Sequence, residues 1–239
     1  KYRHLLVSGC SFTHEPHGQW YPFAWPSLLA DRLGMTVTNL AIPGAGNDHI
    51  SKSLILHIEK NTVDPTDTLI LAMWSGINRI DWITDQSLSN FKDHYAFTYK
   101  YDDYNELVVG GNWWNIAHPN SLTKVLLDYS KYQSDHSFSL ATWLAMQNLS
   151  NYLANKKFDY YYTSFVHYDS YPSELTRLGL EFDHDRWLDL NPEDHYGDWA
   201  RQNNFLDKDG FHPRYPEAQE GWVDKVLIPG LQDLGVVYE

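Results

Sequence analysis

Residues 68–74, TLILAMW, form an almost uninterrupted apolar run with polar residues on both sides. A strand that is apolar at nearly every position has to be covered on both faces, which is typical of parallel sheets flanked by helices. The run therefore predicts a buried strand, and it limits the fold to those that place other elements above and below that strand.

The residues before this run alternate between strand and helix patterns. Short apolar strands are predicted at about 4–8 and at 35–40, and Pro43-Gly44 ends the second. Between them, Trp25-Pro26 begins a helix with proline in its first turn, and Gly34 ends it.

A second helix is predicted between the second strand and the TLILAMW strand. Asn47 or Asp48 can cap its start, and Ile50, Leu54 and Ile58 recur at the spacing of one buried helix face. Strands separated by helices of this length are usually joined by right-handed crossovers into a parallel sheet. The order β, α, β, α, β thus predicts a doubly wound α/β fold.

The rest of the chain follows this rhythm less closely. Residues 81–118 are polar and aromatic, and we interpret them as an insertion with one hairpin that pairs 96–101 with 107–109. Residues 167–208 have little periodicity, which predicts an irregular segment with short helical turns. The other expected elements are helices at 122–129 and 140–152, a strand at 158–165, and a last helix from Pro213 to about Leu234 with a break at Pro229-Gly230.

Length and charge limit the organisation and the partners. No linker divides the 239 residues, so a single domain over 1–239 is expected. With 18 Lys and Arg against 31 Asp and Glu, the net charge of −13 disfavours nucleic acid and anionic lipid as partners. No apolar run reaches the roughly 20 residues of a membrane span, and the start lacks a signal-peptide pattern. A soluble location, cytoplasmic or phage-associated rather than secreted, is the expectation.

Four polar stretches are predicted to meet at one edge of the sheet. Ser11 follows the first strand, Gly44 the second and Asn78 the third, while Asp209 and His212 precede the last helix. Ligands of open parallel sheets bind beyond the carboxyl ends of the strands, where such loops converge. The expected site therefore contains residues from both ends of the chain.

The residue types in this set suit acyl transfer. A serine hydroxyl needs a base to take its proton, and His212 is the candidate, with Asp209 able to orient its imidazole. The oxyanion that develops on the substrate needs preorganised donors. The N–H groups of Ser11 and Gly44 and the side-chain amide of Asn78 are the candidates.

The stretches GCSFT, NLAIPGAGN, WSGIN and DGFHP, in this order, resemble the four motif blocks of the GDSL-type (SGNH) serine hydrolase superfamily. The resemblance implies Ser11 as nucleophile, Asp209 and His212 as its partners, and Ser11, Gly44 and Asn78 as the oxyanion hole. It implies a three-layer, flavodoxin-like α/β/α sandwich with a mainly parallel sheet of about five strands, and no cofactor.

The sequence departs from this family's pattern at two places. Gly9-Cys10-Ser11-Phe12 replaces Gly-Asp-Ser-Leu, and Arg79 follows Asn78 where the family commonly has Asp. The Gly-Cys-Ser-Phe-Thr start, with the Trp-Pro and Asn-Leu-Ala-Ile-Pro-Gly that follow, resembles a subgroup associated with bacteriophage and environmental bacterial genomes. These changes leave the proposed catalytic groups in place and bear on the substrate instead. His14, Arg79 and Trp82 are the candidate substrate-binding residues.

Each candidate also has a simpler interpretation. Ser11 can cap a helix, and Asn78 can be a turn residue. Cys10 is expected to be a small buried residue, because successive extended residues point to opposite faces and only one of Cys10 and Ser11 can face the site. The segments 14–17 and 183–185 carry His, Asp and Glu, but neither has a third ligand at a recognised spacing, so no metal is expected.

The sequence thus predicts a serine esterase or O-deacylase that acts through an acyl-enzyme on a small-molecule or glycan ester. The high aromatic content and the lack of an apolar lid favour acylated carbohydrate. Two alternatives stay open: a non-catalytic binding or structural protein that retains the fold, and an acyltransferase that uses the same residues.

Overall fold

A computed structural model describes most of the chain. For residues 80, 82–84, 96–101, 104–109, 135 and 184 only the backbone is described. The described residues are 2–14, 24–77, 79–84, 96–101, 104–109, 134–165, 177, 179–180, 184–188, 191, 194–206, 213 and 216–236.

The main sheet is parallel throughout. Strand β1 (His4–Ser8) lies between β2 (Thr36–Asn39) and β3 (Thr68–Trp74), and β7 (Asp159–Ser164) pairs with the far side of β3. Tyr162 of β7 also forms a single parallel bridge with Trp187. The predicted α/β class with a mainly parallel sheet is confirmed, and the described residues contribute four strands and this bridge.

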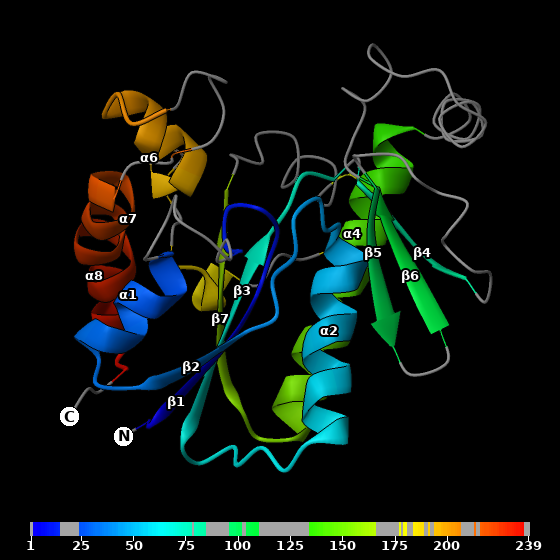
Figure 1. Cartoon of the computed structure of the whole chain (residues 1–239), viewed down its shortest axis with the longest axis horizontal. Coiled ribbons are helices and arrows are strands. Elements are labelled where there is room, and N and C mark those ends of the chain that lie inside the picture. Colours follow the sequence, from blue (N-terminus) through cyan, green and yellow to red (C-terminus); the bar gives the residue numbers. More distant parts are fainter. Residues whose placement is uncertain are drawn as a thin grey trace.

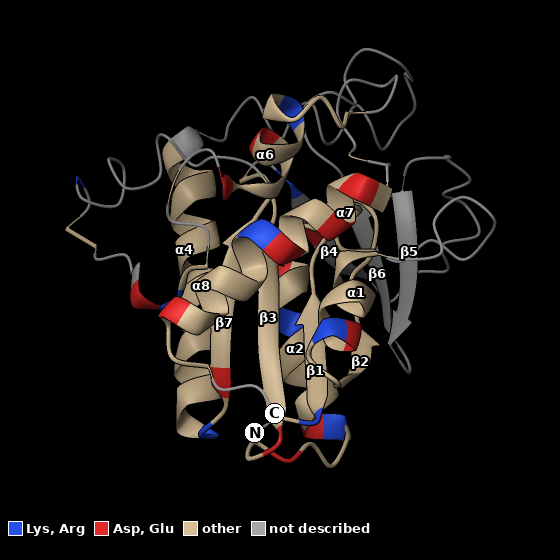
Figure 2. Cartoon of the chain, turned by 90° about the vertical axis from the view of Figure 1, so that its left-hand side faces the viewer, with Lys and Arg blue, Asp and Glu red and all other residues tan. Residues whose placement is uncertain are grey.

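Helices cover both faces of this sheet (Figure 1). On one face lie α2 (Asn47–Lys60) and α4 (Asp135–Asn155), which pack against each other. On the other face lie α1 (Trp25–Arg32), α7 (Pro216–Trp222) and α8 (Ile228–Asp233), and Figure 2 shows these three in front of the strands. This arrangement is compatible with the expected three-layer sandwich.

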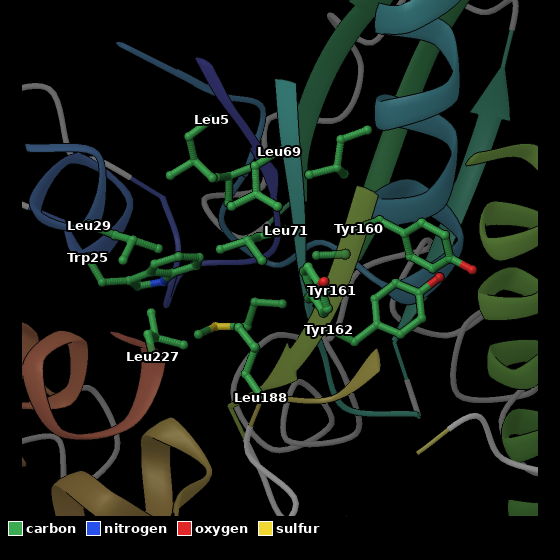
Figure 3. Packing of buried hydrophobic residues seen from close by; sticks show 14 of the residues in the cluster. Leu5, Trp25, Leu29, Leu69, Leu71, Tyr160, Tyr161, Tyr162, Leu188 and Leu227 are labelled. Carbon is green, nitrogen blue, oxygen red and sulfur yellow. The ribbon is translucent and has the colours of Figure 1, made fainter. Parts of the chain in front are cut away.

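The core forms where these helices meet the strands. In Figure 3, Trp25, Leu29 and Leu227 gather on one side of the sheet and the rings of Tyr160 and Tyr162 on the other. Every residue of β3 is buried, as the TLILAMW pattern predicts. Each fully buried large apolar side chain contributes roughly 2 kcal/mol, so covering both faces of the strand is what stabilises it.

The insertion forms a second, antiparallel sheet. Its three strands have the order β4 (Ile80–Thr84), β6 (Tyr104–Val109), β5 (Ala96–Tyr101). The expected hairpin is confirmed as β5 and β6, whereas β4 was not predicted, because its partner lies more than twenty residues away and its own pattern is too short to indicate pairing. The helix expected at 122–129 lies outside the described residues. The expectation of a single domain over 1–239 stays a prediction.

The last helix differs from the expectation. No break occurs at Pro229-Gly230, because the backbone stays helical from α7 through a π-helical segment, η5 (Val223–Leu227), into α8. Pro229, which has no N–H donor, lies two residues after the end of the π-helical segment, where the regular α-helical hydrogen-bond pattern is already interrupted. The short helical turns expected within 167–208 are η3 (His184–Arg186) and α6 (Tyr196–Gln202).

Candidate functional site

Ser11 lies in a tight turn directly after β1. The N–H groups of Thr13 and His14 both donate to the carbonyl oxygen of Cys10, at 2.9 Å each. Cys10 is fully buried, as expected, while Ser11 is partly exposed. The next described helix begins only at Trp25, so Ser11 caps none of the helices that the structure describes.

Gly9 makes this turn compact. A Cβ at Gly9 would lie 2.2 Å from Oγ1 of Thr13, which is itself fully buried and donates to Sδ of Met73 at 3.1 Å. Because the threonine side chain folds back over the glycine, the Gly-x-Ser-x-Thr pattern fixes the path of the chain around Ser11.

The loop after β2 is bonded to this turn. Ile42 donates its N–H to the carbonyl of Gly9 at 3.2 Å, and Asn39 donates Nδ2–H to the carbonyl of Thr13 at 2.8 Å. Oδ1 of Asn39 also accepts the N–H of Ala41 at 3.0 Å. Sequence reasoning missed Asn39, although an asparagine at the end of a strand is a common signal for such a loop contact.

His14 belongs to the same contact. Its Nδ1 lies 2.9 Å from the carbonyl oxygen of Ala41. Because a carbonyl only accepts, Nδ1 carries the hydrogen, and in the neutral ring Nε2 is then the acceptor. His14 is therefore a partly exposed imidazole of fixed tautomer, three residues after Ser11.

Gly44 lies in the loop that these bonds hold. Its φ of +80° is in the left-handed region, which favours glycine, and Ala45 closes the turn by donating to the carbonyl of Ile42 at 3.3 Å. The structure thus places the Gly44 loop against the Ser11 turn, as the sequence predicts.

The N-terminus of α2 is capped from a distance. The carboxylate of Asp81, on β4, accepts the N–H of Gly46 at 2.9 Å and that of His49 at 2.9 Å. The expected capping by Asn47 or Asp48 is wrong, because Gly46 is the N-cap and has no side chain to offer. A carboxylate at this position satisfies helix N–H groups and complements the helix dipole.

Asn47 has a different function in the structure, which sequence reasoning missed. Its Nδ2 donates to the carbonyl of Ser75 and to Oγ1 of Thr142, both at 3.0 Å, and its Oδ1 accepts the N–H of Ser75 at 2.7 Å. The amide thereby fixes the segment that follows β3, which leads to position 78.

Arg79 connects the loops after β2, β3 and β7. Its Nη1 donates to the carbonyl of Ala45 at 3.1 Å, and its guanidinium carbon lies 5.2 Å from the ring centroid of Phe165. That ring stacks on Phe12, with 4.3 Å between centroids. Arg79 therefore contacts the residue that follows Gly44 and, through one ring, the residue that follows Ser11.

The C-terminal part of the chain approaches the same edge through Tyr196. Its hydroxyl donates to the carbonyl of Pro213 at 3.4 Å, and its ring lies edge-on to Phe12 at 6.2 Å. Nε2 of Gln219 donates to the same carbonyl at 3.2 Å. One tyrosine thus separates Pro213, which follows His212 in the sequence, from Phe12, which follows Ser11.

Several predicted site residues are not among those that the structure describes. Asn78, Asp209 and His212 lie outside the described residues, and only the backbone of Trp82 is described. Among the described residues, no group of three or more His, Cys, Asp and Glu side chains could hold a metal ion.

A second serine and histidine meet at the end of β7. Oγ of Ser164 lies 3.2 Å from Nδ1 of His195, which precedes α6. Ser164 has no exposed surface and His195 only 5%. An ester carbonyl cannot reach a fully buried hydroxyl, so this pair holds α6 against the sheet rather than forming a nucleophile and base. It was not predicted, because Ser164 has the pattern of an ordinary strand residue.

These features define the class: an α/β protein whose loops converge at the carboxyl edge of a parallel sheet. The chain passes from β1 to β2 on one side and then crosses to β3 on the other, which is the switch point where such folds bind ligands. None of the described helices is long and apolar enough to cross a membrane.

The chain belongs to a family of unknown function, DUF6071, whose model it matches over residues 16–230. The matched range includes positions 44, 78, 209 and 212 and begins after Ser11. No curated protein matches the chain.

Proposed function

We propose that this protein is a serine esterase or O-deacylase of the GDSL (SGNH) type that works through an acyl-enzyme. The observation that supports it most is the hydrogen-bonded contact between the Ser11 turn and the Gly44 loop at the carboxyl edge of the sheet. Pro213 lies one tyrosine ring from Phe12, which agrees with His212 acting at the same edge.

In the proposed mechanism, Oγ of Ser11 attacks the ester carbonyl carbon while His212 takes the hydroxyl proton. The resulting oxyanion is held by the N–H groups of Ser11 and Gly44 and by the amide of Asn78. The intermediate collapses with release of the alcohol, which receives the proton from His212. His212 then takes a proton from water, which attacks the acyl carbon, and it returns this proton to Oγ of Ser11 as the carboxylic acid leaves. Asp209 orients the imidazole throughout.

The proposed substrates are O-acyl groups on carbohydrate. Ten Trp and seventeen Tyr in a chain of net charge −13 suit a polar, ring-shaped substrate better than a lipid surface. An acyltransferase would use the same residues with a sugar hydroxyl in place of water. Comparing acetate release with acetyl transfer to an added sugar distinguishes the two reactions.

The first test is hydrolysis of a short-chain aryl acetate by the wild type, Ser11→Ala and Ser164→Ala. Loss of the nucleophile is expected to lower kcat by at least about a thousandfold. Ser164→Ala is the matched control, because it removes a serine that contacts histidine at the same sheet edge, and it should keep its activity if it stays folded. Full activity in Ser11→Ala, or no hydrolysis of any ester by the wild type, would refute the proposal.

A second test distinguishes two histidines. His14 is close to Ser11 in the sequence, and His212 is the base of the proposed site. We expect His212→Gln to abolish hydrolysis and His14→Gln to reduce it only through weaker substrate binding. The wild-type rate should fall on the acidic side as a histidine base becomes protonated, near the ordinary imidazole pKa of about 6.5. If instead His14→Gln abolishes hydrolysis while His212→Gln keeps both the rate and its acidic limb, His14 is the base and the assignment of His212 is wrong.

A further inference from the structure

Arg79 is one of two partly buried arginines for which the described residues offer no ion pair. Arg3, Arg32 and Arg201 each form an ion pair with an aspartate, whereas no described carboxylate pairs with Arg79 or Arg186. Arg186 lies against Tyr160 of β7, whereas Arg79 contacts the loop that holds Gly44, next to the Ser11 turn. Within the described part of the chain, Arg79 uses one of its five N–H donors, on the carbonyl of Ala45. Arg79 as a whole is partly buried, and its guanidinium carbon lies over the ring of Phe165.

The nearest carboxylate in sequence is already occupied. Asp81 lies two residues further along the chain, and both of its oxygens accept N–H groups at the start of α2. Removing a cation from water without an anionic partner costs stability. In a chain of net charge −13, an arginine placed this way at a ligand-binding edge points to an anion supplied by the ligand.

The kind of anion follows from the cation. A guanidinium offers a planar pair of N–H groups that matches the two oxygens of a carboxylate. Among the described contacts, Arg79 is the one Lys or Arg side chain beside Ala45 and Phe165. A carboxylate, with a single negative charge, therefore balances its charge better than a dianionic phosphate does. The Ala45 bond and the Phe165 ring also restrain the side chain before a ligand arrives, which lowers the entropy cost of binding.

We propose that Arg79 binds a carboxylate of the substrate and thereby selects acidic esters. The carboxylate can belong to the acyl group, as in a succinyl ester, or to the sugar, as in an acetylated hexuronic acid. Selection of acidic esters rests on the proposed esterase function. The binding of a carboxylate by Arg79 does not depend on hydrolysis.

The binding test uses carboxylates alone. We expect succinate or glucuronate to bind the wild-type protein in calorimetric titration, and Arg79→Gln to weaken that binding by about 10- to 100-fold, the range of a charge-assisted hydrogen bond. Succinamide and glucose are the neutral control ligands. Binding of succinate tests whether the carboxylate belongs to the acyl group, and binding of glucuronate tests whether it belongs to the sugar.

The matched control variant is Arg186→Gln. Arg186 is also partly buried, its guanidinium carbon lies 4.7 Å from the ring centroid of Tyr160, and the substitution removes the same charge. Its carboxylate binding should equal that of the wild type. Arg79→Lys keeps the charge but not the planar pair of donors, so intermediate affinity is expected, and it gives a second result should Arg79→Gln fail to fold.

The hydrolysis test compares matched esters: an aryl succinate with an aryl butyrate, and an acetylated hexuronic acid with the acetylated hexose. Arg79→Gln should lower the ratio of kcat/KM for the acidic over the neutral member of one pair by about 10- to 100-fold. Ser11-dependent hydrolysis with an unchanged ratio in both pairs, or equal carboxylate binding by wild type and Arg79→Gln, refutes the anion site. Carboxylate binding that needs Arg79, with no hydrolysis of any ester, refutes the esterase and leaves the anion site standing.

Discussion

Replacing Asn47 tests how the edge of the sheet is held in place. The side chain is 4% exposed and makes three hydrogen bonds, two to the main chain of Ser75 and one to Thr142. At about 0.5–1.5 kcal/mol for each bond, Asn47→Ala should cost about 2–4 kcal/mol in the free energy of unfolding. For a chain of this size that corresponds to a fall in Tm of about 5–15 °C.

Asn47→Asp gives a sharper version of this prediction. At an exposed helix start, a new negative charge usually stabilises by about 0.3–1 kcal/mol. Here the aspartate keeps the bond from the Ser75 N–H but cannot donate, and it directs a carboxylate oxygen at the Ser75 carbonyl. The substitution should therefore destabilise the protein at least as much as Asn47→Ala does.

The assay is urea unfolding followed by tryptophan fluorescence, with Asp48→Asn as the matched control. Asp48 is the next residue of α2, is exposed, and pairs with Lys52 at 2.9 Å, so its change should cost no more than about 0.5 kcal/mol. The reasoning is refuted if Asn47→Ala costs no more than this control, or if Asn47→Asp stabilises the protein.

Three further predictions follow from other contacts. Gly9→Ala should destabilise by about 1–3 kcal/mol through overpacking, and the loss should shrink when Thr13→Ala is added, which a double-mutant cycle measures. Asp81→Ala should cost about 1–2 kcal/mol in denaturant unfolding, because it removes both bonds to the start of α2. Burial and the hydrogen bond to Glu59 raise the pKa of Tyr152, so the folded state keeps this phenolic proton longer and stability is lost as pH rises above about 10. Tyr152→Phe should flatten that alkaline decline in Tm, and an equally steep decline would contradict the assignment.

The sequence predicted the elements whose signals are local. The TLILAMW run and the Trp25-Pro26 helix start depend on neighbouring residues, and both elements lie where their patterns place them. The capping of α2 was misassigned because the acceptor, Asp81, comes from a strand thirty-odd residues later. Strand β4 was missed for the same reason: its pairing with β6 is a contact between distant segments, and no short window of sequence carries it.

The candidate site shows the same division. The Ser11 turn and the Gly44 loop were predicted from motif order, and their contact depends on β1 and β2 being adjacent parallel strands, which the crossover rule supplies. Asn39 holds this contact and Asn47 fixes the segment after β3, yet in the sequence they resemble ordinary turn and capping residues. Their role appears only when the partners, Thr13 and Ser75, are brought near by the sheet.

Residue type alone does not identify a nucleophile at this edge. Ser11 follows the parallel strand β1 and Ser164 is the last residue of β7. Ser164 also has a histidine, His195, at hydrogen-bond distance. Burial separates them, since Ser164 is closed off beneath α6 while Ser11 keeps exposed surface in its turn. Gly197 explains the closure: a Cβ there would lie 2.4 Å from the carbonyl oxygen of Phe165, so only glycine lets α6 approach β7 this closely. A larger residue at position 197 would therefore force α6 away from the carbonyl of Phe165. Gly197 thus allows the close packing in which Ser164 and His195 are buried, and Ser11 is the one of the two serines that a substrate can reach.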